Sequence, residues 1–249
     1  MHRLCIHSLH RSFRTTLLVT PLTTDTARAA TMVHAGASPS WEQMWAAGLQ
    51  PGQAFDVGSA SATLLGCLSR GSYAGRTGMR ALVPGCGRAY DALALAAHGF
   101  DEVVALDLAP TAVQSARAFL AASEDAGAAR VTCVEGDFFE HAGTYDFIWD
   151  CTFLCALDPS VRVRWAERTR TLLAPDGVLA ACVFPIAPNK VGGPPFALSP
   201  QLLKDLLEPT GLKCEVVEVD DSERHVPGAM KGGNLPGTAL LLARPAAAS

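Results

Sequence analysis

From Arg80 onward, short apolar runs of strand length alternate with longer segments whose apolar residues recur at helical spacing. This alternation predicts a parallel sheet with helices on both faces. The strand-like runs are Arg80–Val83, Val103–Leu106, Val131–Val134, Phe147–Trp149, Val178–Phe184, Leu212–Val219 and Thr238–Ala243. The helical segments are Tyr90–His98, Pro110–Ser123, Arg162–Leu173 and Ser199–Leu207. We therefore expect one α/β domain with a mostly parallel, seven-stranded sheet.

The composition excludes several classes of protein. Hydrophobic residues make up 49% of the 249 residues, which is too apolar for a disordered chain. Twenty basic residues stand against 24 acidic ones, so a nucleic-acid partner has no electrostatic support. Apolar runs such as Thr238–Ala243 are far shorter than the roughly 20 residues that cross a bilayer, and we expect no membrane span.

The eight cysteines are scattered, with no C-x-x-C pair and no Cys/His spacing typical of a zinc site. Most lie in apolar stretches, where a free cysteine behaves as a small hydrophobic residue. The sequence therefore predicts a reducing compartment, no disulfide framework and no bound metal.

Residues 1–31 differ in composition from the predicted domain, residues 32–249. No acidic residue precedes Asp25, whereas Arg3, Arg11 and Arg14 are spaced among many serines and threonines. This composition is typical of an organellar transit peptide, which would direct the protein to a mitochondrion or plastid. An untargeted N-terminus of a cytoplasmic protein, with Met32 as a start site, is the alternative.

Four predicted strands end on residues suited to a ligand. Gly85 and Gly87 follow the first, and Asp107, Asp137 and Asp150 follow the next three. Ligands of open α/β sheets bind beyond the carboxyl ends of the strands, where a glycine turn admits close approach and a carboxylate can accept ribose hydroxyls. Together these residues indicate an adenosine-containing ligand, although each aspartate alone could also be a turn or capping residue.

Tyr90 decides between a dinucleotide and S-adenosyl-L-methionine. It occupies the position of the third glycine of G-x-G-x-x-G, where a bulky side chain would obstruct the approach of a pyrophosphate. S-adenosylmethionine has no pyrophosphate, so an NAD-dependent oxidoreductase is disfavoured. In the turn after the third strand, Asp137 could accept the adenine amino group while Phe138 packs on the base.

Several motifs resemble those of the thiopurine S-methyltransferase family, in its thiol and halide methyltransferase branch. They are Trp41-Glu42-Gln43-Met44-Trp45, Leu82–Gly87 with Tyr90-Asp91, Leu106–Ala112, Tyr145–Asp150 and Gly192-Gly193-Pro194-Pro195-Phe196. The resemblance runs from about Trp41 to Gly232 and implies the Rossmann-like fold of a class I methyltransferase that uses S-adenosyl-L-methionine.

The same resemblance implies roles for individual residues. Trp41, Trp45 and Phe55 would close over the cofactor, and a sulfonium near aromatic rings gains about 0.5–2 kcal/mol. The two tryptophans lie four residues apart, on one helical face, and could instead be a core-packing pair. The remaining cofactor contacts would be Gly85, Asp107, Asp137, Phe138 and Cys151.

The expected acceptor pocket is small and apolar. It would be formed by Thr152 and Phe153 after the fourth strand, opposite Pro195 and Phe196, and neither segment contains Arg or Lys. Such a pocket suits a thiol, hydrosulfide or halide, a nucleophile that needs no metal and no dedicated base, and no catalytic residue stands out. His225 could accept a proton, although a loop histidine often has no such role. We expect a monomer; a thiopurine-type enzyme acting on aromatic thiols and a non-catalytic S-adenosylmethionine-binding module remain alternatives.

Overall fold

The computed structural model describes residues 40–71, 73, 77–228 and 235–246. The chain divides into two units, Met1–Ser38 and Pro39–Ser249, and every element described below belongs to the second. The predicted leader, residues 1–31, lies outside the described residues. Within the described part of the chain, no helix has the length and apolarity that a membrane span requires.

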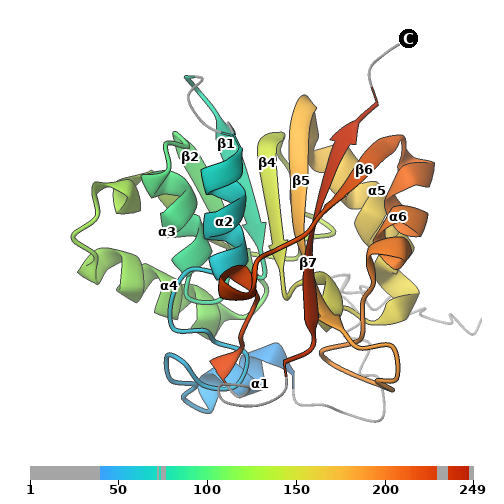
Figure 1. Ribbon diagram of the computed structural model, residues 1–249. Coiled ribbons are helices and arrows are strands. Elements are labelled where there is room, and N and C mark those ends of the chain that lie inside the picture. Colours follow the sequence, from blue (N-terminus) through green and yellow to red (C-terminus); the bar gives the residue numbers. More distant parts are fainter. Residues whose placement is uncertain (1–39, 72, 74–76, 229–234, 247–249) are drawn as a thin grey trace, which may run out of the picture. The chain divides into compact units, whose positions relative to one another are not determined.

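A seven-stranded sheet in the order β3-β2-β1-β4-β5-β7-β6 forms the centre of this unit (Figure 1). Neighbouring strands are parallel except at β7, which runs antiparallel to both β5 and β6. The strands are β1 (Arg80–Pro84), β2 (Glu102–Asp107), β3 (Val131–Glu135), β4 (Tyr145–Cys151), β5 (Leu173–Ile186), β6 (Leu212–Val217) and β7 (Gly237–Pro245). The predicted Rossmann-like, mostly parallel sheet is confirmed.

Helices cover both faces of the sheet. They are α1 (Trp41–Ala46), α2 (Ala62–Arg70), α3 (Tyr90–Ala97), α4 (Pro110–Ala122), α5 (Arg162–Leu172) and α6 (Pro200–Leu207). Buried side chains of α2, α3 and α4 join the core on one face, and those of α5 and α6 join the core on the other. The four predicted helices are present, but the sequence patterns did not predict α2.

The predicted bounds differ most around β5. The helix α5 ends at Leu172, and β5 begins directly at Leu173 instead of at the predicted Val178, so that Pro175-Asp176-Gly177, residues typical of a turn, lie inside the strand. Its pairing with β4 shifts register there, between Tyr145↔Leu173 and Phe147↔Val178. The turn residues thus form an irregularity inside a long strand and do not separate two elements.

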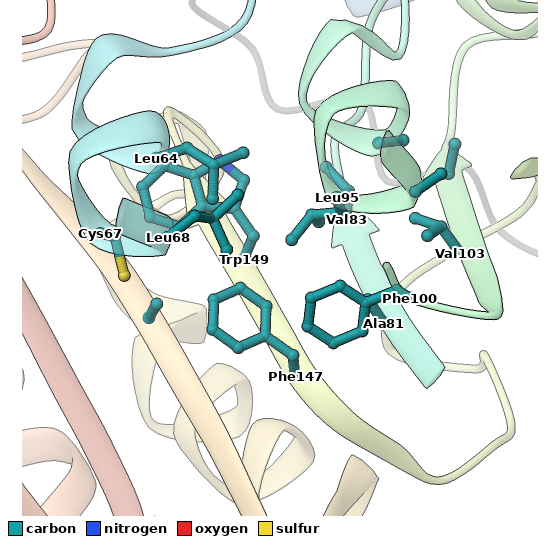
Figure 2. Close-up of a cluster of buried hydrophobic side chains, with 14 of the residues drawn as sticks. Leu64, Cys67, Leu68, Ala81, Val83, Leu95, Phe100, Val103, Phe147 and Trp149 are labelled. Carbon is teal, nitrogen blue, oxygen red and sulfur yellow. The ribbon is translucent and has the colours of Figure 1, made fainter. Parts of the chain in front are cut away.

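Large side chains fix the position of β4 against α2 and β1. Figure 2 shows Phe147 and Trp149 of β4 beside Leu64 of α2 and Phe100, all of them buried. The rings of Phe100 and Phe147 lie 5.4 Å apart. Full burial of side chains of this size contributes about 1.5–3 kcal/mol each.

This core positions the functional end of the sheet. Because β1 and β4 are neighbours although two strands separate them in sequence, the strand order reverses between them. In doubly wound sheets the crevice at such a reversal is where ligands bind. The glycine turn after β1 and the segment after β4 flank this point.

Candidate cofactor and acceptor site

The turn between β1 and α3 holds its two predicted glycines in the left-handed region, with φ +61° at Gly85 and +52° at Gly87. A Cβ on Gly85 would lie 2.8 Å from the ring of Phe153, and a Cβ on Gly87 would lie 3.3 Å from the ring of Trp45. Only glycine fits both the backbone conformation and the available space. The turn therefore lies between one aromatic ring from α1 and another that follows β4.

Asp107, at the end of β2, binds this turn directly. One carboxylate oxygen accepts the N–H of Gly87 at 3.0 Å and the other accepts the N–H of Ala109 at 3.0 Å. Burial raises the pKa of this carboxyl above its usual value. A carboxylate has about four lone-pair sites, so it can still accept a hydroxyl group beside these backbone donors.

The turn after β3 is adjacent, because the N–H of Gly136 donates to the Asp107 carbonyl at 2.9 Å. The exposed Asp137 carboxylate accepts the N–H of Phe139 at 2.8 Å, which is the turn-capping role that the sequence left open. The ring of Phe138 is buried and packs 5.1 Å from the ring of Phe153. Contacts of Asp137 and Phe138 with an adenine base stay predictions.

The three aromatic residues predicted to cover the cofactor lie together. The ring of Phe55 is 5.5 Å from that of Trp41 and 5.8 Å from that of Trp45, both in edge-on geometry. Glu42 ties α1 to the start of α4, where its carboxylate accepts the N–H of Thr111 at 3.0 Å. Trp45 is also buried against alanines of the α4 region, so it serves as a core residue as well.

A partly buried ion pair that the sequence patterns did not reveal fixes the loop after α1. Arg88 donates to Asp56 at 2.9 Å and to the carbonyl of Leu49, and its guanidinium lies 5.3 Å from the ring of Trp45. Asp56 also accepts the N–H of Gly58 at 2.7 Å. The loop that carries Phe55 is thus anchored to the residue that follows the glycine turn.

Asp150, at the end of β4, is 2% exposed and has two internal donors. It accepts the N–H of Leu154 at 3.1 Å and the indole N–H of Trp165 at 3.0 Å. Burial raises its pKa to about 6. These contacts favour the capping role over contact with a ligand.

The two predicted acceptor segments meet. The N–H of Phe196 donates to the carbonyl of Cys155 at 2.7 Å, which joins the segment containing Pro195 to the one that follows β4. Thr152 has a left-handed backbone, with φ +60°, and donates its hydroxyl to the carbonyl of Cys151 at 2.6 Å. The apolar surfaces of Phe153 and Phe196 therefore belong to one region beside the glycine turn.

One cation lies in this region although neither acceptor segment contains one. Arg162, the first residue of α5, is 8% exposed and its guanidinium lies 5.8 Å from the centre of the Phe196 ring. Its Nε and Nη2 have no hydrogen-bond partner within the described residues. Burial lowers its pKa. The place of Arg162 in this region follows from the packing of α5 against the Phe196 segment and could not be found from the sequence.

The predicted cofactor contact Cys151 faces His225. Its Sγ lies 3.6 Å from Nδ1 of His225, which is 3% exposed. Burial alone would lower the pKa of His225, but attraction to Cys151 and Asp91 raises it. The imidazole is enclosed here and packs against Phe184.

Comparison with known proteins gives first the class and then the family. A solved glycopeptide N-methyltransferase, complexed with S-adenosylmethionine, has the same fold, with a TM-score of 0.58 at 16% identity over 77% of this chain and 90% of that one. The fold is that of the class I methyltransferases, which use S-adenosylmethionine. The chain belongs to the thiopurine S-methyltransferase family, whose family model matches residues 37–233. It is an S-adenosylmethionine-dependent S-methyltransferase.

Two plant relatives are similar over most of their length. A probable thiol methyltransferase 2 of Arabidopsis thaliana is 37% identical over 204 residues, which cover 81% of this chain and 84% of the relative. A thiocyanate methyltransferase 1 of Brassica oleracea is 34% identical over 181 residues, which cover 72% of this chain and 75% of the relative.

The described residues fit S-adenosylmethionine. The Asp107 carboxylate can still accept a hydroxyl group, and it binds the glycine turn. In that turn a Cβ on Gly85 or Gly87 would contact an aromatic ring. Tyr90 begins α3 in place of a third glycine, and its ring lies 4.8 Å from that of Phe119 in α4. A dinucleotide would require space at the start of α3. This arrangement offers a nucleoside site without a pyrophosphate site.

Proposed function

We propose that the enzyme transfers the methyl group of S-adenosylmethionine to a small, polarizable anion, namely a thiolate, hydrosulfide or halide. The observation that carries this proposal is the buried Arg162 guanidinium over Phe196, with two N–H-bearing atoms that have no partner among the described residues. A cation beside the apolar rings of Phe196 and Phe153 favours a monovalent anion.

Charge and size both support this acceptor class. A guanidinium keeps its charge when buried, so an anion entering the pocket exchanges water for a charged donor. A single arginine offsets one negative charge, whereas a phosphate would require more donors. Phe153 and Phe196 supply apolar surface, against which a large soft anion loses less hydration energy than a small hard one.

The residues of the chain would align the acceptor and exclude water. Bound S-adenosylmethionine supplies an electrophilic methyl group on a positive sulfonium. Trp45 lies against Gly87 from the α1 side, with the ring of Phe55 packed on it, and Phe153 lies against Gly85 from the β4 side. A thiol with an ordinary pKa of about 8.5 is easier to ionise beside positive charge, so the proposal needs no dedicated base.

The names of the two plant relatives, a thiol and a thiocyanate methyltransferase, agree with such an acceptor. Thiols, thiocyanate and hydrosulfide share a polarizable sulfur that can carry one negative charge. Aromatic thiols, as in a thiopurine-type enzyme, share the sulfur but need a larger pocket.

One experiment separates these acceptors. The full chain is incubated with methyl-labelled S-adenosylmethionine and equal concentrations of iodide, thiocyanate, hydrosulfide, a small thiol, an aromatic thiol, a catechol, a carboxylate and an amine. We expect the highest kcat/KM among the small sulfur and halide acceptors. Faster turnover of an oxygen or nitrogen acceptor, or of the aromatic thiol, contradicts the proposal.

A further inference from the structure

Two cysteines on neighbouring strands and one histidine from a distant segment meet below the strand ends. Cys151 of β4 and Cys182 of β5 are direct partners in the parallel register. His225 follows the 3₁₀ turn Asp221–Glu223 and brings its imidazole against them. One ligand atom from each residue lies within 4.8 Å of the other two.

The spacing suits a tetrahedral metal ion. Zinc binds sulfur at about 2.3 Å and imidazole nitrogen at about 2.0–2.1 Å, so two ligand atoms around it are separated by roughly 3.5–3.8 Å. The observed Cys151 Sγ to His225 Nδ1 distance is 3.6 Å. The donors therefore need little movement to enclose an ion.

Burial and charge favour a divalent, thiophilic ion. Cys182 is 2% exposed and His225 is 3% exposed, and Nε2 of His225 has no hydrogen-bond partner in the described part of the chain. Two thiolates and a neutral imidazole neutralise a divalent cation, which lowers the cost of burying it. A monovalent copper ion would leave a net negative charge, and magnesium and calcium prefer oxygen ligands.

Polar groups complete the surroundings. The Ser61 hydroxyl lies 3.9 Å from the sulfur of Cys151, and the Thr63 hydroxyl lies 3.9 Å from the sulfur of Cys182. The cluster is buried, so an ion would have to enter through local opening of the fold. One coordination position is left for a hydroxyl or a water molecule.

We propose that Cys151, Cys182 and His225 form a binding site for Zn²⁺. Binding forms two Zn–S bonds and one Zn–N bond and releases the two thiol protons to water, so the affinity rises with pH. The ion would join the segment around His225 to β4 and β5 and would stabilise the fold. Methyl transfer needs no such ion, so the zinc proposal does not rest on the proposed acceptor, although Cys151 is also a predicted cofactor contact.

The test titrates the full, metal-free chain with Zn²⁺ in the presence of a phosphine reductant and a competing chromophoric chelator. We expect one equivalent to bind, at least tenfold more weakly in Cys182→Ser and in His225→Gln. Matched controls are Cys133→Ser and Cys214→Ser, which change cysteines outside the cluster and should bind as the unchanged protein does. The N-terminal segment also contains Cys5, His2, His7 and His10. A variant with these four residues replaced should still bind one equivalent of Zn²⁺.

A second measurement needs no variant. Because the cluster is buried, alkylation is carried out in low urea, where opening of the fold exposes its thiols, and is mapped by mass spectrometry with and without Zn²⁺. We expect Zn²⁺ to protect Cys151 and Cys182 but not Cys214. The proposal is overturned by equal alkylation in both conditions, by a Zn²⁺ equivalent that depends only on the N-terminal residues, or by recovery of Cys151 and Cys182 as a disulfide under the reducing conditions used.

Discussion

The Asp107 carboxylate accepts the N–H of Gly87 at 3.0 Å, so the side chain that ends β2 fixes the turn that ends β1. The same carboxylate binds the N–H of Ala109 at the start of α4. One buried acid thereby sets the relative positions of two strand ends and a helix. Asp107 is the last residue of β2, at the end of the sheet where the cofactor is expected.

Replacing Asp107 by Asn should weaken binding of S-adenosylmethionine about 10- to 100-fold, corresponding to roughly 1.5–3 kcal/mol. The amide keeps the shape of the side chain but directs an N–H group at one of the two backbone donors. Titration calorimetry measures the change, with Glu124→Gln, an exposed acid beyond α4, as the control. Unchanged affinity in Asp107→Asn would exclude this carboxylate from the cofactor site.

A comparison of two glycine variants distinguishes the effect of backbone strain from the effect of a clash in the site. Gly85→Ala and Gly211→Ala both place a Cβ at positive φ, which costs about 1 kcal/mol, but only the Cβ at position 85 meets Phe153. We expect Gly85→Ala to lose more thermal stability than Gly211→Ala, because Phe153 must also move, and we expect methyl transfer to be lost in Gly85→Ala alone. Equal activity of the two variants would show that Phe153 tolerates displacement.

The sequence predicted what depends on local pattern, namely the strands, the strand-end carboxylate and the glycine turn. A strand end and the helix after it are set by neighbouring residues, and parallel strands bring such ends together. The roles of Trp41, Trp45 and Phe55 followed from family resemblance; the three rings lie together in the structure, and their contact with the cofactor stays a prediction.

The charged and sulfur groups of the site could not be predicted in this way. Arg162 reaches Phe196 only because α5 packs beside the segment that follows β5. Cys151, Cys182 and His225 have no metal-binding spacing in the sequence, yet strand pairing and a distant loop bring their ligand atoms together. Contacts between residues far apart in the chain depend on tertiary packing, which short-range periodicity does not contain.

Asp150 should make stability depend on pH. Burial raises its pKa from 3.8 to about 6, so the folded protein binds a proton that the unfolded chain releases between about pH 4 and pH 6. Stability from this group is therefore full below about pH 4 and is lost as the pH rises to about 6. Urea unfolding measures this effect. From pH 4 to pH 7, the free energy of unfolding of the unchanged protein should fall by on the order of 2 kcal/mol relative to that of Asp150→Asn. A constant difference would mean that Asp150 has an ordinary pKa in the fold.

Arg162→Met tests the proposed role of the guanidinium. Methionine fills a similar volume without charge, and removing a buried group with unpartnered N–H donors should leave thermal stability unchanged or slightly higher. We expect KM for iodide and hydrosulfide to rise about tenfold, with a smaller effect on kcat and on S-adenosylmethionine affinity. If KM for these anions stayed constant, Arg162 would be a packing residue only. Arg164→Met, an exposed arginine of the same helix, is the matched control.

Phe196→Ala should widen the range of acceptors. The substitution removes a ring from the proposed acceptor pocket and keeps the backbone hydrogen bond to Cys155, so it adds volume without adding charge. We expect the ratio of kcat/KM for a bulky aromatic thiol to that for hydrosulfide to rise severalfold. Val191→Ala, an almost fully exposed side chain in the same segment, should leave the ratio unchanged. Selection by size must change kcat/KM differently for the two acceptors. If both values fell by the same factor in Phe196→Ala, the ring would instead support the fold of its segment.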